Sequence, residues 1–361
     1  MPKRFLSLFI LLLIALPVNA EEKKPYRVGV ILPLSGPYAG LASYAHKAIE
    51  LAYENFTPEQ KALVEIVFQD DQFDNKQTVT GYNQLNSHPG GLDAVFTIAS
   101  PPSLTLAPIT NRNKDILIAI GASDAKIVDG EKYAFIHWVT PPVLGDVLAA
   151  ELKQRDFKKI AFLSAEASGA IADMDACISA LKELGHGDRV IHREIFPTTY
   201  TDFRTDLLKI KNKDADAIVV ALFPGALSSF AKQARSVKLP AELIGMETFE
   251  DEGEVNAAEG ALDGTWYVNA SDPTDEFISM YKTKYNQHPG WAAGNAYDAV
   301  QLILAAVAAV GNDNDKVRDY LRNIKDFSGA SGVFSSSGDQ RFTLPAALKR
   351  VTKNGFEAYR P

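Results

Sequence analysis

The sequence predicts an α/β fold of two domains, each built around a doubly wound parallel sheet. Two observations lead to this prediction. Short, nearly continuous apolar runs rich in β-branched residues alternate with amphipathic stretches of helical spacing along most of the chain. In addition, the 361 residues exceed what a single hydrophobic core usually holds. Continuous apolar runs are typical of parallel strands that helices cover on both faces.

The predicted strands fall into two series, and each series is expected to form one α/β domain. The first comprises residues 27–32, 65–69, 94–98, 117–120 and 135–139, and the second 159–164, 190–196, 217–222, 242–245 and 265–268. Helices are expected between them at 41–53, 75–86, 144–154, 169–184, 201–211 and 225–237, with a further one beginning near Leu104. Repetition of strand, helix and strand indicates right-handed crossovers within each sheet.

The last part of the chain departs from this alternation. Residues 273–285, 294–310 and 313–323 read as three helices with little strand between them, and 334–338 read as a loop or turn. This block could cap the second domain or return to the first. The pattern alone leaves both arrangements open.

The first twenty residues are predicted to be a secretory signal peptide. Lys3 and Arg4 supply a positive start, residues 5–16 form an apolar run, and residues 18–20 form a small-residue cleavage site. The apolar run is shorter than the roughly 20 residues that a membrane span needs, which disfavours the alternative of a retained anchor. Cleavage after Ala20 would start the mature chain at Glu21, where no cysteine is available for a lipid anchor. We therefore expect a free periplasmic protein with no direct membrane insertion.

Charge and cysteine content exclude several kinds of partner. The formal net charge of −8 becomes −10 once Lys3 and Arg4 are removed with the signal peptide. An acidic surface repels nucleic acid and anionic lipid, so neither is an expected partner. The single cysteine, Cys177, lies in a predicted helix and cannot form an internal disulfide. Buried packing is its expected role, with a free reactive thiol as the alternative.

No catalytic or metal-binding pattern can be assembled from the sequence. G-x-S-x-G, H-E-x-x-H, C-x-x-C, a Walker-type loop and G-x-G-x-x-G after the first strand are all absent. The six histidines are scattered, and none pairs with another at metal-ligand spacing. The sequence therefore predicts no enzyme, no catalytic residue, no metal and no cofactor.

Polar residues instead mark three predicted strand ends, where open α/β sheets bind ligands. Ser100 follows strand 94–98 and could help to hold an anion at a helix start, although Ser103 could serve as an ordinary helix N-cap there. Residues 121–124 follow the neighbouring strand, with an ordinary turn as the alternative. Glu247 follows strand 242–245 and could bind an ammonium group, or it could be a solvated carboxylate of the acidic run that continues to Glu254.

In their order and spacing these segments resemble the type I periplasmic binding proteins of the branched-chain amino-acid (leucine/isoleucine/valine) family. The resemblance covers essentially the whole mature chain. The segments that carry it are residues 28–40 (VGVILPLSGPYAG), Asp70-Asp71 with Gln77, residues 233–239 (QARSVKL) and residues 296–299 (AYDA).

The resemblance implies two Rossmann-like lobes with parallel sheets joined by three crossovers, near 139–143, 268–271 and 341–345. Lobe one would comprise residues 21–139 and 272–340, because the helices of the tail would return to it. Lobe two would comprise residues 143–268 and 346–361.

The resemblance also implies a ligand site between the lobes. Lobe one would hold an amino acid's carboxylate, and lobe two would bind its ammonium group and line the pocket with an aromatic ring. The matching residues are Ser100, Gly121, Ala122 and Ser123 in lobe one, and Glu247 and Phe223 in lobe two. Two positions depart from the family pattern, since Leu41 and Ser168 stand where aromatic residues are common. The loss of these aromatics argues against taking leucine itself as the ligand.

We accordingly expect the substrate-binding component of an ABC importer, which captures a small amino acid or a similar molecule and presents it to an inner-membrane permease. Three alternatives remain open at this point. The same fold could serve as a periplasmic ligand sensor, it could bind an amide, urea or aromatic acid, or a doubly wound sheet could carry an enzyme.

Overall fold

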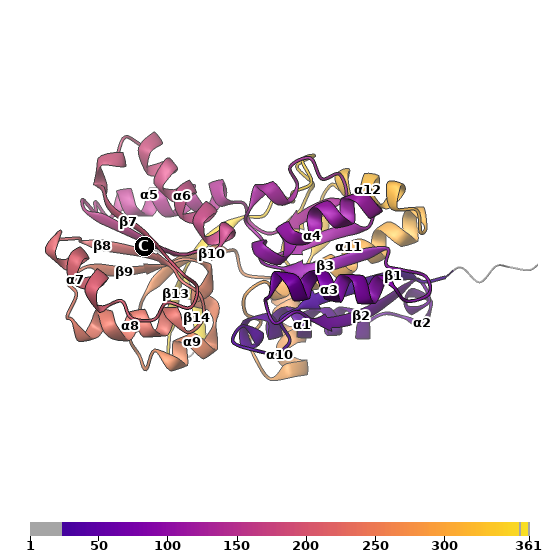
Figure 1. Cartoon of the computed structure of the whole chain (residues 1–361), viewed down its shortest axis with the longest axis horizontal. Helices are drawn as coiled ribbons and strands as arrows, with labels where there is room; N and C mark the ends of the chain where they lie inside the picture. Colours follow the sequence, from indigo (N-terminus) through magenta and orange to yellow (C-terminus); the bar gives the residue numbers. More distant parts are fainter. Residues whose placement is uncertain (1–23, 354, 360–361) are drawn as a thin grey trace, which may run out of the picture.

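The computed structural model describes residues 24–353 and 355–359, which form two lobes side by side along the long axis of the molecule (Figure 1). The predicted signal peptide, residues 1–20, lies outside the described residues. Each lobe is an α/β layered structure with one central sheet, as the sequence predicts. We call the lobe that carries β1 lobe one and the other lobe two.

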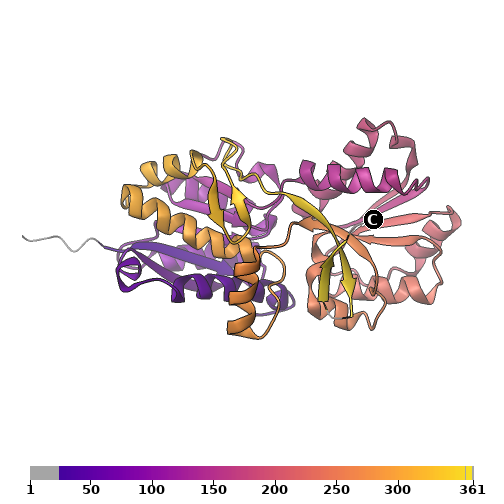
Figure 2. The ribbon, with the colours of Figure 1, turned by 180° about the vertical axis from the view of Figure 1, so that it is seen from behind.

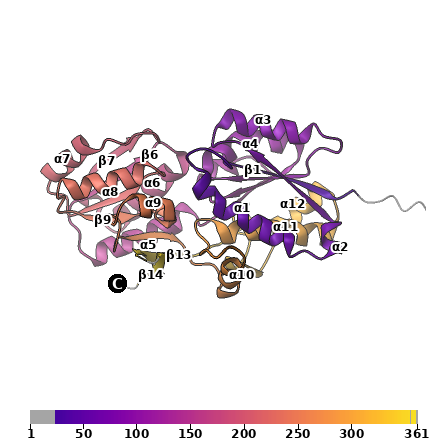
Figure 3. The same ribbon diagram turned by 90° about the horizontal axis from the view of Figure 1, so that it is seen from below.

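The sheet of lobe one contains five parallel strands in the order β2-β1-β3-β4-β5. The strands are β1 (Tyr26–Leu32), β2 (Val64–Asp70), β3 (Ala94–Ile98), β4 (Ile116–Ile120) and β5 (Ala134–His137). All but β2, the edge strand, are buried along their whole length, which explains their continuous apolar sequence. Figure 3 shows α3 (Asn75–Asn86) and α4 (Ser100–Asn113) on one face and α1 (Ala39–Glu54) on the other. The short α2 (Pro58–Lys61) and η1 (Ala125–Ile127) complete the connections.

The sheet of lobe two contains seven strands in the order β14-β13-β10-β9-β8-β6-β7. Its strands are β6 (Ile160–Ala165), β7 (Val190–Phe196), β8 (Ala217–Ala221), β9 (Glu242–Gly245), β10 (Trp266–Ala270), β13 (Ala346–Thr352) and β14 (Gly355–Ala358). The strands from β6 to β10 are parallel, as predicted. β13 and β14 were not predicted; β13 pairs antiparallel with β10, and β14 pairs antiparallel with β13 at the edge of the sheet. Their alternating burial gives only a weak strand signal in a segment rich in lysine and arginine.

Helices cover both faces of this second sheet as well. Figure 1 shows α5 (Pro141–Gln154) and α6 (Ser168–Glu183) above the sheet, and α8 (Ala226–Ser236) and α9 (Glu252–Ala257) below it. The remaining elements are η2 (Gly187–Arg189), α7 (Arg204–Asn212) and η3 (Glu247–Glu250). Cys177 of α6 is fully buried, which agrees with its expected packing role.

The tail returns to lobe one, which decides the question that the sequence pattern left open. The helices α10 (Asp275–Tyr285), α11 (Ala293–Val310) and α12 (Asn314–Arg322) pack there, with α11 lying along α1 (Figure 2). Among the described residues, α11 alone is long and apolar enough to span a membrane, but about two thirds of it is buried inside the lobe. It is therefore a core helix. A short hairpin follows, formed by β11 (Phe327–Gly329) and β12 (Gly332–Phe334), so Phe334 ends a strand where a turn was predicted.

Three chain segments connect the lobes. They run from β5 to α5, from β10 to α10, and from the β11–β12 hairpin to β13. The second and third lie side by side, because the backbone N–H of Ser271 donates to the carbonyl of Pro345. The third also touches the first, since the N–H of Ile136 donates to the carbonyl of Gln340. Connecting segments of this kind can act as the hinge about which two domains close.

One helix begins earlier than the sequence predicts. α4 starts at Ser100 and not near Leu104, directly after Ala99, whose φ of 65° lies in the left-handed region. Ser103 is consequently inside the first turn, where its hydroxyl donates to the carbonyl of Ala99. The alternative that Ser103 is the helix N-cap is therefore wrong. The early start places Ser100 at the helix N-terminus, facing the other lobe.

Candidate functional site: a cavity between the lobes

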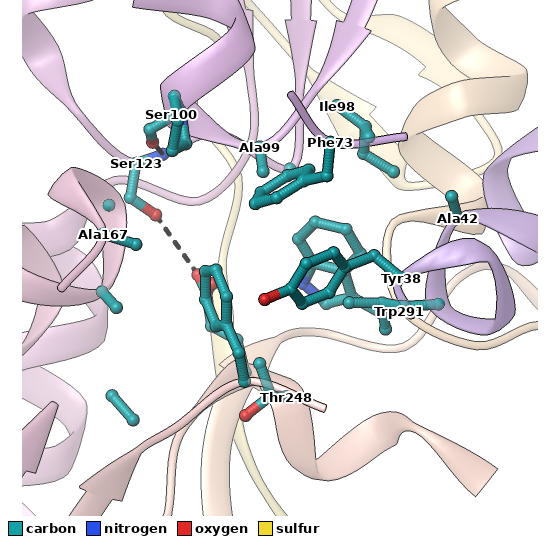
Figure 4. Close-up of a pocket in the computed structure, with 18 of the residues that line it drawn as sticks. Tyr38, Ala42, Phe73, Ile98, Ala99, Ser100, Ser123, Ala167, Thr248 and Trp291 are labelled. Carbon is teal, nitrogen blue, oxygen red and sulfur yellow. Dashed lines mark hydrogen bonds between the residues drawn. The ribbon is translucent and has the colours of Figure 1, made fainter. Parts of the chain in front are cut away.

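A cavity with an empty volume of about 700 Å³ lies between the lobes, at the carboxyl ends of the parallel strands. Both lobes line it, and its walls are mostly apolar. Figure 4 shows Ser100, Ser123, Phe73, Tyr38 and Trp291 from lobe one around the same space as Ala167 and Thr248 from lobe two. A mostly apolar cavity at this position, with a few polar groups from both lobes, suits a small molecule.

Ser100 ties together the two loops that form the lobe-one wall. Its Oγ accepts hydrogen bonds from the backbone N–H of Ser123, at 3.0 Å, and of Asp124, at 3.1 Å. The hydroxyl proton of Ser100 is then left to donate to a further acceptor. Pro101 and Pro102 follow in the helix and have no backbone N–H, so the hydroxyl of Ser100 adds a donor where the first turn of α4 offers few.

Two helix N-termini face each other across the cavity at this point. Ser100 begins α4 in lobe one, and Ser168 begins α6 in lobe two. Their approach is close, because a Cβ added at Gly169 would lie 2.6 Å from the Oγ of Ser100. Both macrodipoles present their positive ends here, an arrangement that favours an anionic group such as a carboxylate.

Glu247 comes from the opposite lobe, at the start of η3, and its carboxylate reaches the lobe-one wall. Its carboxylate accepts hydrogen bonds from the indole N–H of Trp138 and from the hydroxyl of Ser123, the latter at 3.3 Å (dashed in Figure 4). Both donors belong to the lobe-one side, so the lobes meet at this carboxylate. Removal from bulk water raises the pKa of Glu247 to about 7, even though both hydrogen bonds act to lower it.

Asp173 was not identified in the sequence, yet it lines the same wall as Glu247. It projects from α6, where Gly169, Ala170 and Asp173 share the helix face toward the cavity. Burial and the neighbouring charge of Glu247 raise the pKa of Asp173 well above its usual range. The available signal was a lone acidic residue four positions after Gly169 on an otherwise small and apolar face.

Aromatic rings close the remaining side of the cavity. Tyr38 lies 4.7 Å from Phe73 and 5.9 Å from Phe223, measured between ring centroids, and Phe73 lies 6.0 Å from Phe223. Figure 4 shows the hydroxyl of Tyr38 pointing toward the middle of the pocket, with Trp291 beside it. The pocket is therefore rich in aromatics despite Leu41 and Ser168, because Tyr38, Phe73 and Trp291 supply the rings from positions that the sequence did not single out.

Most of the residues singled out in the sequence meet at this cavity. Those that line it are Ser100, Gly121, Ser123, Leu41, Phe223 and Glu247. Two others do not line it. Ala122 is completely buried behind the wall, and the hydroxyl of Ser168 is buried beside the cavity without a hydrogen-bond partner. Small neighbours, Gly121 and Gly169, occupy the cavity surface at these two places instead.

The charged groups of the lining are all acidic. The lining contains two carboxyl groups but no lysine, arginine, histidine or cysteine. Within residues 24–353 and 355–359, no three histidine, cysteine, aspartate or glutamate side chains gather in a way that could hold a metal ion. What remains is a hydroxyl and helix-dipole region for an anion, a carboxyl region for a cation next to it, and aromatic rings on the remaining side.

Comparison with known proteins agrees with this geometry. Residues 25–356 match the family model described as periplasmic binding protein. A Leu/Ile/Val-binding protein homolog of Brucella melitensis is 23% identical over 326 residues, which cover 86% of this chain and 88% of the relative.

Solved structures agree on the fold. A leucine binding protein from Thermotoga maritima superposes with a TM-score of 0.85 at 20% identity, covering 92% of this chain and 97% of that one. An ABC transporter solute binding protein from R. palustris in complex with benzoate superposes with a TM-score of 0.82 at 18% identity, covering 92% and 95%.

Because the family model spans nearly all of the described residues, the chain belongs to the periplasmic binding protein family, and the resemblance seen in its sequence is confirmed: it is a solute-binding protein of the kind that serves ABC transporters.

Proposed function

We propose that this protein captures a small zwitterionic amino acid, or a close analogue, between its two lobes and delivers it to an inner-membrane permease. The observation that carries this proposal is the convergence of Ser100 and Ser123 from lobe one with Glu247 from lobe two on one cavity. An anion-binding region of lobe one beside a carboxylate of lobe two matches the neighbouring carboxylate and ammonium groups of an amino acid.

The ligand's carboxylate is placed at the facing N-termini of α4 and α6. There the hydroxyl of Ser100 donates to it and the two helix dipoles stabilise its charge. The ammonium group is placed at Glu247, as a charge-assisted hydrogen bond. The side chain then extends toward Tyr38, Phe73 and Phe223, which favours an apolar or aromatic side chain over a charged one.

Capture requires no bond chemistry, and we propose that the protein is not an enzyme. The ligand binds lobe one in the open form and is then enclosed as lobe two closes about the three connecting segments. A ligand drives closure only if it binds the closed form better than the open one, so contacts from both lobes are needed. The predicted signal peptide would bring the protein to the periplasm, where the permease recognises the closed form.

An aromatic acid is the second candidate ligand. The aromatic wall of the cavity favours it, and the R. palustris relative is a benzoate complex. The two carboxyl groups of the lining act against it, because a second anion in a pocket without basic residues is repelled. An amide or urea ligand, and a role as a periplasmic sensor on the same fold, remain alternatives for the same cavity.

The test is a thermal-shift screen of the mature protein against the protein L-amino acids, their des-amino acids and benzoate, followed by calorimetry. A ligand at a hundred times its dissociation constant adds about 2.7 kcal/mol to the free energy of unfolding, so binding is easily seen. Glu247→Gln should weaken amino-acid binding at least about tenfold, the loss of one charge-assisted bond. Glu166→Gln makes the same change at an exposed site of lobe two and should have no effect. Binding of benzoate, with no response to any amino acid, would contradict the proposal.

A further inference from the structure

The lobe-two wall presents two carboxyl groups to the cavity where an ammonium needs only one. Asp173 comes from α6 and Glu247 from η3, and the two carboxyls lie within hydrogen-bonding reach of each other. Asp173 is only 1% exposed. Two ionised carboxylates repel each other strongly in so buried a place, which favours a proton held by the pair when no ligand is bound.

Among the residues that the structure describes, no basic side chain lines the cavity beside this pair. The other charge on the element of Glu247 is that of Glu250, which raises the pKa of Glu247 further. Glu250 has its own partner in Lys349, which points away from the cavity toward the connecting segments. In lobe one, Asp124 follows Ser123, and its carboxylate accepts a hydrogen bond from the backbone N–H of Lys126.

The groups that do contact the pair are neutral donors. Ser123 and Trp138 donate to Glu247, and Ser123 also contacts Asp173. Tyr38 adds a phenol to the same cavity. These donors stabilise one negative charge on the pair, but they cannot balance two.

Two polar atoms of the cavity wall have no hydrogen-bond partner although they are buried. One is the Oδ1 of Asp173, an acceptor, and the other is the indole Nε1 of Trp291, a donor on the opposite lobe. Trp291 is only 5% exposed. Unpaired buried polar atoms are rare in folded proteins, and a pair of them in one cavity points to a bound molecule that supplies their partners.

We propose that Asp173 and Glu247 together form a cation subsite, in which a primary ammonium group of the ligand contacts both carboxyls and replaces the proton that they share. This inference rests on the proposed function and deepens it, because it names the group that selects amines. The ammonium keeps its three covalent N–H bonds and donates a hydrogen bond to each of the two carboxylates. The displaced proton leaves to solvent. Ligands without an amine cannot displace it. Binding must then become tighter as the pH rises toward ionisation of the pair.

The first experiment uses the wild-type protein and isothermal titration calorimetry at pH 7, in phosphate and in Tris. These buffers differ in ionisation enthalpy, so the difference in observed heat counts released protons. The probes are L-leucine, L-phenylalanine, 2-phenylethylamine and 3-phenylpropionate. We expect the amino acids and the amine to release between about half a proton and one proton, and their Kd to fall by up to about tenfold per pH unit below pH 7. We expect no release with 3-phenylpropionate.

The second experiment compares Asp173→Asn with Asp175→Asn, a matched change on the same helix where the carboxylate instead pairs with Arg193 at the surface. Asp173→Asn should weaken the binding of amino acid and amine at least about tenfold and reduce proton release, while Asp175→Asn should match the wild type. If Asp173→Asn fails to fold, as judged by circular dichroism, proton release by the wild-type protein still tests the cation subsite.

The outcomes separate this inference from the proposed function. Amino-acid binding without proton release, or unchanged by Asp173→Asn, overturns the cation subsite and leaves the proposed function standing. Binding of 2-phenylethylamine with proton release, without binding of either amino acid, supports the subsite and counts against capture of a zwitterion. If none of the amines or amino acids binds, both fail.

Discussion

Substitution of Gly169 by alanine is expected to block lobe closure without harming the fold. Gly169 is the second residue of α6, and the added methyl group would lie 2.6 Å from the Oγ of Ser100 in the other lobe and 3.7 Å from the Cβ of Ser123. Ordinary contacts begin near 3.4 Å, so the two lobes would have to separate by almost one ångström along this line.

Ser100 cannot easily move out of the way. Its Oγ accepts hydrogen bonds from the N–H groups of Ser123 and Asp124, and rotation of the side chain would break both. Overpacking in a well-packed site typically costs about 1–3 kcal/mol. Since this cost falls on the closed form alone, it appears in the binding equilibrium, where it corresponds to a rise in Kd of roughly 5- to 150-fold.

The assay combines calorimetric Kd values for the best amino acid of the screen with small-angle X-ray scattering, with and without that amino acid. Gly169→Ala should bind weakly and should not become more compact on addition of the amino acid, whereas its unfolding midpoint without ligand should stay unchanged or rise, because alanine favours a helix over glycine.

The matched control is Gly40→Ala, at the second position of α1, where an added Cβ meets nothing within 4 Å. It should bind like the wild type. If Gly169→Ala also binds within about twofold of the wild type, the lobes do not close onto Ser100 at this point and the reasoning is refuted.

Three further outcomes follow from the same contacts. Glu247→Gln should flatten the dependence of the free energy of unfolding on pH. The pKa of Glu247 is raised from 4.5 to about 7 in the folded protein, so the stability that Glu247 contributes is present below pH 4.5 and lost as the pH rises through 7. In the wild type this loss is on the order of 2–3 kcal/mol between pH 5 and pH 8. Urea unfolding of ligand-free wild type and variant should therefore differ more in the variant's favour at pH 8 than at pH 5, and an equal difference at both would count against a raised pKa. Lys349→Met should lower the free energy of unfolding by roughly 3 kcal/mol, because it leaves the buried Glu250 without its cation, and a loss below about 1 kcal/mol in urea unfolding would show that solvent replaces the pair. Gly145→Ala should lower the thermal midpoint, since its Cβ would lie 2.7 Å from the backbone of Ala176 where α5 packs on α6, and a wild-type midpoint would mean that the two helices can move apart.

Parallel strands, helix positions and the family could be predicted from the sequence because they depend on local patterns. A nearly continuous apolar strand such as residues 94–98 can be recognised in the sequence, because burial on both faces of the sheet selects apolar residues along its whole length. β13 and β14 were missed because antiparallel strands at a sheet edge carry alternating and charged residues, which resemble a loop. The start of α4 was misplaced because two prolines at its first turn read as a turn, although proline is well tolerated there.

The candidate site shows the same division. The positions of Ser100, Ser123 and Glu247 could be inferred from strand ends, because parallel strands bring their carboxyl ends to one edge. Their meeting across the lobes was implied only by the family resemblance, because strand ends alone do not say how the second lobe closes on the first.

By itself, then, the sequence determined two α/β domains, the acidic surface charge, the family and the three polar strand ends. Only the tertiary structure decided that Asp173 joins Glu247 and that Tyr38, Phe73 and Trp291 replace the aromatics absent at Leu41 and Ser168. The return of the tail helices to lobe one was implied by the family resemblance, but the hydrophobic pattern left it open. The physical reason is that periodicity and propensity act over neighbouring residues, whereas a pocket is made by side chains that only the packing of distant elements brings within a few ångströms.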